Sequence, residues 1–289
     1  MKKTDSFEND QIFPIEEIFA KLPHLSENIF GRLDDRSLVS CREVSKTWQG
    51  YVDSQRIYWI RQIIKCNPPQ SKFHGEWKKV LDKTPIEILK EFARLVGSRP
   101  PHIEYSPLHI AGIIGDVELF KSIQQKTGLN ENSESNTSGM TAFHPRNSLG
   151  FTPLHYAAHH GHVNICQLIC EKIIGTGLHL RSSSPVKMVY GPESNSGFTP
   201  LHFAACFGHV EVCKFLCLNL EEKNPRNKYG LTPLHIAAEK GHLDVCEFLC
   251  SNLQDKNPKC DDEKTPMDLA YSNKHWKIVH FLIEENNLA

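Results

Sequence analysis

The sequence contains no long hydrophobic run and no surplus of either charge. None of its apolar stretches approaches the roughly 18 residues of a membrane-spanning helix. Lysine and arginine number 33 against 34 aspartates and glutamates, for a net charge of −1, whereas nucleic-acid and membrane-surface binders carry a basic excess. The first ten residues turn acidic at once and lack the apolar segment of a signal peptide. We therefore expect a soluble cytoplasmic protein, with the nucleus as a second location, that binds neither nucleic acid nor membrane.

The motifs of common catalytic sites are also missing. The sequence has no Gly-rich phosphate loop, no G-x-S-x-G, no H-E-x-x-H and no paired C-x-x-C. These absences argue against enzymes that use nucleotides, a serine nucleophile or zinc. We expect no catalytic activity, no cofactor and no metal, with an enzyme kept as a rival interpretation.

Six of the ten cysteines occur in pairs spaced four residues apart, which places both members on one face of a helix. The pairs are Cys166 and Cys170, Cys213 and Cys217, and Cys246 and Cys250. In a reducing compartment such residues act as small buried apolar groups. We expect them to be free thiols in a core.

A four-residue motif, Thr-Pro-Leu-His or a close variant, recurs five times along residues 106–268. Its copies begin at Ser106, Thr152, Thr199, Thr232 and Thr265. The last three copies are 33 residues apart, whereas the first two gaps are longer and indicate inserts at about 127–147 and 175–196. A constant period of this length is typical of stacked supersecondary units, which build extended binding surfaces.

Each copy reads as a turn, a helix, a tight turn, a second helix and a loop. In the fourth copy Gly230 suits a left-handed turn, Thr232 is a good helix N-cap, and Pro233 occupies the first helical position. Gly241 then breaks the first helix. The predicted fold is therefore all-α over this region.

Residues 102–289 resemble the ankyrin repeat family, whose T-P-L-H-x-A-A-x-x-G-H units they reproduce. The last unit departs from this pattern, with Glu263 and Lys274 where glycines are usual and Asp268 in place of histidine. End units face water and need not accept a neighbour. The resemblance implies a solenoid of five helix-turn-helix units that binds a protein target.

The recurring histidines and cysteines could suggest zinc, as in the set His155, His162 and Cys166. However, the set recurs because the unit recurs, and its spacing matches no compact zinc pattern. We expect these histidines to hydrogen-bond turn backbone between units instead.

The first hundred residues lack the repeat and predict a small three-helix module over 12–66. This stretch resembles an F-box, with a Leu-Pro start, an I-F-x-x-L segment and later Leu, Val and Trp positions. The resemblance implies docking on a Skp adaptor through Leu22, Pro23, Ile29, Phe30, Leu33, Leu38, Val44 and Trp48. Val44 and Trp48 lie four residues apart on one predicted helix face and are the members most expected to be structural.

Two features of this half leave alternatives open. Leu22-Pro23 lies one residue closer to Ile29 than the F-box pattern has it, and a second start, Phe13-Pro14, lies upstream. A helical linker is predicted over 67–101, where Leu89, Phe92 and Val96 form an apolar stripe. This helix packs either on the F-box helices or on the ankyrin array.

Ankyrin proteins commonly bind targets through hairpin tips and the residues before the helix-breaking glycine. Here those positions are Leu149, Phe151, His159, His160, Asn195, Ser196, Phe198, Cys206, Phe207, Lys228, Tyr229, Leu231, Glu239 and Lys240. Several are aromatic, which suits a protein interface, unless neighbouring repeats cover them.

Together the two resemblances imply the substrate-recognition subunit of a Skp–cullin–F-box ubiquitin ligase. Its partners would be a Skp-type adaptor, a cullin and an unidentified protein target. Two other non-enzymatic interpretations remain: an ankyrin interaction scaffold without a ligase role, and an effector that borrows a host ligase.

Overall fold

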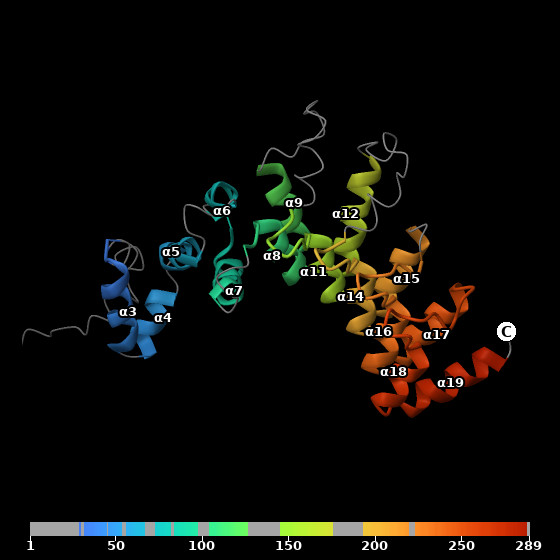
Figure 1. Cartoon of the computed structure of the whole chain (residues 1–289). Coiled ribbons are helices and arrows are strands. Elements are labelled where there is room, and N and C mark those ends of the chain that lie inside the picture. The colour runs from blue at the N-terminus through green and yellow to red at the C-terminus, as the bar shows by residue number, and fades with distance from the viewer. Residues whose placement is uncertain are drawn as a thin grey trace, which may run out of the picture. The chain divides into compact units, whose positions relative to one another are not determined.

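The structure is a computed structural model, and it describes residues 29, 32–44, 46–53, 56–66, 73–81, 84–97, 104–126, 145–175, 193–219 and 223–287. Every regular element in these ranges is a helix (Figure 1), which confirms the predicted all-α class. Contacts divide the chain into two compact units, Met1–Pro68 with Leu81–Ser98, and Pro69–Val80 with Arg99–Ala289. None of the described helices combines the length and the apolarity that crossing a membrane requires.

The first unit contains four described helices. They are α3 (Asp35–Val44), α4 (Lys46–Asp53), α5 (Arg56–Cys66) and α7 (Ile86–Gly97). The Asp34 carboxylate accepts the backbone N–H of Ser37 at 2.8 Å and so caps the start of α3.

The chain changes direction between α3 and α4. Arg42 Nε lies 2.8 Å from Asp53 Oδ1, although eleven residues of straight helix would separate the two by about 16 Å. The Trp59 indole N–H donates to the carbonyl of Asp53 at 2.7 Å and ties α5 to the end of α4. These bonds fold the three helices onto one another.

Helix α7 packs along α5 within this first unit. Its stripe of Leu89, Phe92 and Val96 is buried, as the periodicity predicts. Of the two alternatives for this helix, the structure therefore shows packing on the F-box helices.

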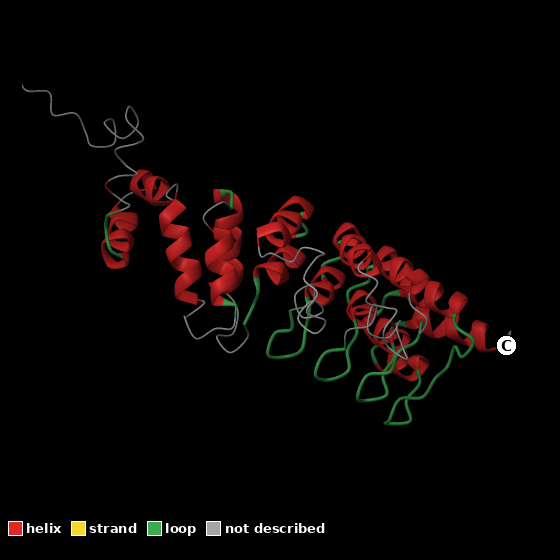
Figure 2. Cartoon of the chain, turned by 90° about the horizontal axis from the view of Figure 1, so that it is seen from above, coloured by secondary structure: helices red, strands yellow, loops and turns green. Residues whose placement is uncertain are grey.

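The second unit stacks five helix pairs behind the short helix α6 (His74–Leu81). The pairs are α8 (Pro107–Ile114) with α9 (Val117–Lys126), α11 (Pro153–His159) with α12 (Val163–Gly175), α14 (Pro200–Cys206) with α15 (Val210–Asn219), α16 (Pro233–Lys240) with α17 (Leu243–Asn252), and α18 (Pro266–Ser272) with α19 (Trp276–Asn287). Figure 2 shows these pairs side by side, with the hairpin loops projecting to one side. The predicted solenoid of five units is confirmed.

The first helix of every pair starts in the same way. Ser106 and its four threonine counterparts are N-caps, and the proline that follows lies at the first helical position. Proline is harmless there because a first-turn N–H has no intrahelical partner. The repeated motif is thus a helix-start signal.

Helix α6 covers the first repeat. The indole N–H of Trp77 donates to the carbonyl of Tyr105 at 2.8 Å, and the ring of Phe73 meets His109 edge-on. Trp77 is almost completely buried. Residues of the predicted linker therefore close the amino-terminal end of the array.

Two histidines in each of the three middle repeats join neighbouring repeats in opposite directions. His202 Nε2 lies 3.1 Å from the carbonyl of Leu231 in the next repeat. His242 Nε2 lies 2.9 Å from the carbonyl of Cys206 in the preceding repeat. The expected backbone hydrogen bonds between units are confirmed. Within the described ranges, no group of three or more potential ligand side chains could hold a metal ion.

The paired cysteines are free thiols inside the array, as expected. Burial raises the pKa of the Cys217 thiol to about 11 and that of Cys250 to about 12. A neutral buried thiol is a poor nucleophile, so these residues serve packing.

The last repeat carries two non-glycine residues in the left-handed region. Glu263 has a φ of 59° and Lys274 a φ of 63°. In the preceding repeat a Cβ at Gly241 would lie 2.6 Å from the imidazole of His275. Among the described residues, no histidine of a following repeat lies against Lys274 as His275 lies against Gly241. A side chain therefore fits at position 274, although the left-handed backbone is strained.

We expect Lys274→Gly to stabilise the array by about 0.5 to 1 kcal/mol, because glycine removes the left-handed strain. The urea midpoint should rise. As a matched control, Lys214→Gly within α15 should lower stability by about 1 kcal/mol. A fall in the midpoint with both variants would contradict the strain argument.

Candidate protein-binding surfaces

The F-box-like module is held by a small apolar core. Leu38, Val52 and Tyr58 are buried together, and Leu33, Cys41, Trp48 and Trp59 pack against them. Leu38 is fully buried and Trp48 is half-buried. Among the predicted docking residues, these two therefore support the module from within.

Other predicted docking residues face outward. Val44 is 65% exposed and Ile29 is 44% exposed. The expectation that Val44 is structural and shares a face with Trp48 is wrong, because α3 ends at Val44 and Trp48 belongs to α4. Val39, which the sequence motif did not single out, is also exposed on α3. The module thus presents apolar side chains that its own core does not use.

Aromatic rings form a chain across the middle repeats. The ring of Phe203 meets Phe151 edge-on at 5.2 Å and lies 6.1 Å from Phe198, and His159 lies 3.8 Å from Phe207. Phe198 also approaches Tyr229 at 6.5 Å. Sequence reasoning missed Phe203, the variable residue of T-P-L-H-x-A, although its place in the repeat could have revealed it.

This aromatic chain is partly covered and partly open. Phe151 and Phe198 are half-buried, so neighbouring repeats do cover much of them. Phe207 and Tyr229 are 44% and 57% exposed, and Leu149 is also exposed. Of these rings, Phe207 and Tyr229 are therefore the most open to solvent.

Comparison with protein families agrees with both halves of this geometry. A family model described as "Ankyrin repeats (3 copies)" matches residues 108–226 and 218–288, more than half of the chain. A model of the F-box domain matches residues 14–60. The chain is an F-box protein with ankyrin repeats. No curated protein matches it significantly.

F-box domains and ankyrin repeats are typically non-catalytic interaction modules, so the chain combines two of them in a protein-interaction adaptor. Three predicted residues of the F-box, Leu22, Pro23 and Phe30, lie outside the described residues. The choice between the Leu22-Pro23 and Phe13-Pro14 starts also concerns residues outside the described ranges.

The other residues of the predicted ankyrin surface divide into two groups by their exposure. His160, Asn195, Lys228 and Lys240 are exposed, whereas His159, Ser196, Cys206, Leu231 and Glu239 are half-buried. Backbone carbonyls of the half-buried group accept inter-repeat bonds: that of Ser196 accepts the N–H of Lys228 at 3.1 Å. Lys240 pairs with Glu239 at 2.9 Å.

The ends of both predicted inserts belong to ankyrin hairpins. Asn147 is buried, and its Oδ1 accepts the N–H groups of Leu149 and Phe151, each at 3.0 Å. Ser194 at the end of the second insert is likewise buried. The predicted insert boundaries therefore extend a few residues too far, because an asparagine or serine turn looks like loop composition. The middle of each insert lies outside the described residues.

Proposed function

We propose that this F-box/ankyrin protein is the substrate-recognition subunit of a Skp–cullin–F-box ubiquitin ligase. The supporting observation is that its F-box module exposes Ile29 and Val44 while its ankyrin array exposes Phe207 and Tyr229. One chain thus offers two separate apolar surfaces. Such a chain suits a cytoplasmic adaptor, with a Skp-type protein and its cullin on one surface and a target on the other.

The docking surface would bury the outward residues of the F-box. Covering the exposed part of Ile29 or Val44, which is 44% or 65% of the residue, contributes about 1 to 2 kcal/mol. Leu33 lies half-buried between this surface and the core, while Leu38 and Trp48 hold the helices that carry it. Leu22, Pro23 and Phe30 complete the proposed set.

The target surface would centre on the open rings of Phe207 and Tyr229. The same surface has three half-buried rings, Phe151, Phe198 and Phe203, and that of Phe198 lies 6.5 Å from the ring of Tyr229. The exposed polar residues around them supply the hydrogen-bonding rim that surrounds an apolar interface centre. This arrangement suits a folded or extended protein segment with apolar side chains.

The proposed mechanism is proximity. Binding of both partners raises the effective concentration of a target lysine near the ubiquitin-conjugating enzyme. This chain would bring the reactants together, and the bond chemistry would belong to its partners.

The proposal is tested by co-purifying the full chain with a Skp adaptor and a cullin. We expect Ile29→Asp/Val44→Asp to abolish capture of both, because two buried charges replace two apolar contacts. Both positions are exposed, so the module should keep its fold by circular dichroism. Leu218→Asp, at an exposed position on α15, is the matched control and should bind normally.

A second experiment tests the ankyrin surface independently of the F-box surface. Phe207→Asp/Tyr229→Asp should retain the Skp adaptor and cullin but lose proteins that the wild type crosslinks through its ankyrin array. Failure of the intact chain to bind any Skp adaptor would exclude the ligase role. An ankyrin scaffold whose helical module serves another purpose would then be the better interpretation.

A further inference from the structure

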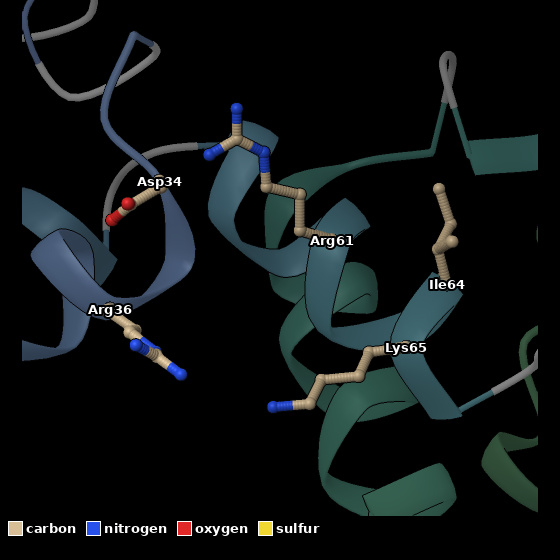
Figure 3. Close-up of a pocket in the computed structure, with 5 residues that line it drawn as sticks. All are labelled: Asp34, Arg36, Arg61, Ile64 and Lys65. Carbon is tan, nitrogen blue, oxygen red and sulfur yellow. The ribbon is translucent and has the colours of Figure 1, made fainter.

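The first unit contains an open pocket that the proposed docking surface does not use. It is lined by Asp34, Arg36, Arg61, Ile64 and Lys65 (Figure 3). Asp34 and Arg36 lie at the start of α3. The other three lie on α5 at positions i, i+3 and i+4, which share one face of a helix.

The charges of this pocket do not balance. Among the lining residues that the structure describes, one carboxylate is present, that of Asp34, and it accepts the N–H of Ser37 as a helix cap. Arg61 donates to the carbonyl of Leu33. The side chains of Arg36 and Lys65 are exposed, and neither forms a hydrogen bond or ion pair with any residue that the structure describes. In Figure 3 their charged ends point toward one another across the pocket.

This local excess is not a background property of the chain. The whole sequence has 33 basic and 34 acidic residues, yet the described lining of the pocket has three cations and one acid. Two like charges that face each other are stabilised when an anion lies between them. Guanidinium binds a carboxylate through two parallel bonds, and ammonium adds a point charge.

We propose that this pocket binds an acidic peptide segment of a protein partner. A carboxylate of the segment would lie between Arg36 and Lys65, and an adjoining apolar side chain would pack on Ile64, which is 37% exposed. The pocket volume of about 760 Å³ accommodates several side chains.

A peptide fits the pocket better than a nucleic acid does. A polynucleotide needs a basic stripe that follows its backbone, whereas the charged ends of Arg36 and Lys65 point toward one another across a pocket that Ile64 also lines. The inference stands apart from the proposed ligase role, since a pocket for an acidic segment does not require Skp docking.

The test uses the full chain and a fluorescent peptide of sequence Glu-Glu-Leu-Glu-Glu, with binding followed by anisotropy at low salt. We expect Arg36→Glu/Lys65→Glu to weaken binding about tenfold or more, since two attractive pairs become repulsive. Lys46→Glu/Lys90→Glu is the matched control: it makes the same charge change at exposed positions of the first unit outside the pocket lining. It should stay within about twofold of the wild type.

Replacing leucine by serine in the peptide should also weaken binding, because the apolar side chain that packs on Ile64 is lost. Equal losses in both double variants would reveal a general electrostatic effect and overturn the proposal. So would an absence of binding to the wild type. Tighter, pocket-dependent binding of an oligonucleotide of equal charge would replace the peptide with a nucleic acid as ligand. Circular dichroism of each variant verifies that the fold is kept.

Discussion

Gly208→Ala should destabilise the ankyrin array by about 2 to 5 kcal/mol. The residue has a φ of +72°, and an added Cβ would lie 2.6 Å from Nδ1 of His242 in the next repeat. The left-handed backbone alone costs about 1 to 2 kcal/mol for alanine. The imidazole would also have to move, which breaks its hydrogen bond to the carbonyl of Cys206 and adds about 1 to 3 kcal/mol.

Comparison with Lys274 distinguishes the cost of the left-handed backbone from the cost of the clash with His242. It occupies the corresponding left-handed position of the last repeat with a φ of 63°, so the backbone conformation by itself is tolerated. The clash with His242 is therefore the part of the cost that is specific to an internal repeat.

The free energy of unfolding in urea measures this effect, with Gly75→Ala as the matched control in the same unit. A Cβ at Gly75 would meet nothing within 4 Å, and alanine is the better helix former. The control should leave stability unchanged or raise it by up to about 1 kcal/mol. Equal small effects at both glycines would contradict the proposed steric lock between repeats.

The fold of the array could be predicted because its signals are local and recur. A threonine cap, a proline at the first helical position and a glycine at the turn each act within a few residues. Five copies of such signals reinforce one another. The inter-repeat role of the histidines also followed, since a polar residue at a buried repeated position requires a partner.

Features that depend on contacts distant in sequence could not be predicted. Trp77 covers the amino-terminal end of the array through a hydrogen bond to the carbonyl of Tyr105, 28 positions later. No local sequence pattern predicts that contact. The exposure of Val44 follows from the change of direction after α3, which is fixed by the Arg42–Asp53 pair. The role of Phe203 depends on rings contributed by two neighbouring repeats.

The second large effect that we expect is a loss of stability of the ankyrin array at low pH. The Nδ1 atom of His202 receives the backbone N–H of Thr199 at 3.0 Å, and an N–H can only donate. Nδ1 is therefore unprotonated, and Nε2 carries the proton that it donates to the carbonyl of Leu231. Protonation of Nδ1 would place its N–H opposite the backbone N–H of Thr199 in the core, so that two donors would face each other. Burial lowers the pKa of His202 from 6.5 to about 4, and burial also lowers the pKa of His235.

A lowered histidine pKa means that the unfolded chain binds more protons than the native chain between pH 6.5 and about 4. Stability is therefore complete above this window and falls as the pH drops through it. For His202 alone the loss at pH 5 is about 2 kcal/mol relative to pH 7.5. Urea unfolding at the two pH values should show at least this decrease for the wild type.

In His202→Gln, which cannot titrate, the decrease between these pH values should shrink by about 2 kcal/mol. His280→Gln is the control, because this histidine is exposed on α19 and does not join two repeats. The array would then be least stable in acid because its repeats are joined through neutral imidazoles. An unchanged pH dependence in His202→Gln would show that other groups carry the acid sensitivity, and the neutral histidine link would lose its support.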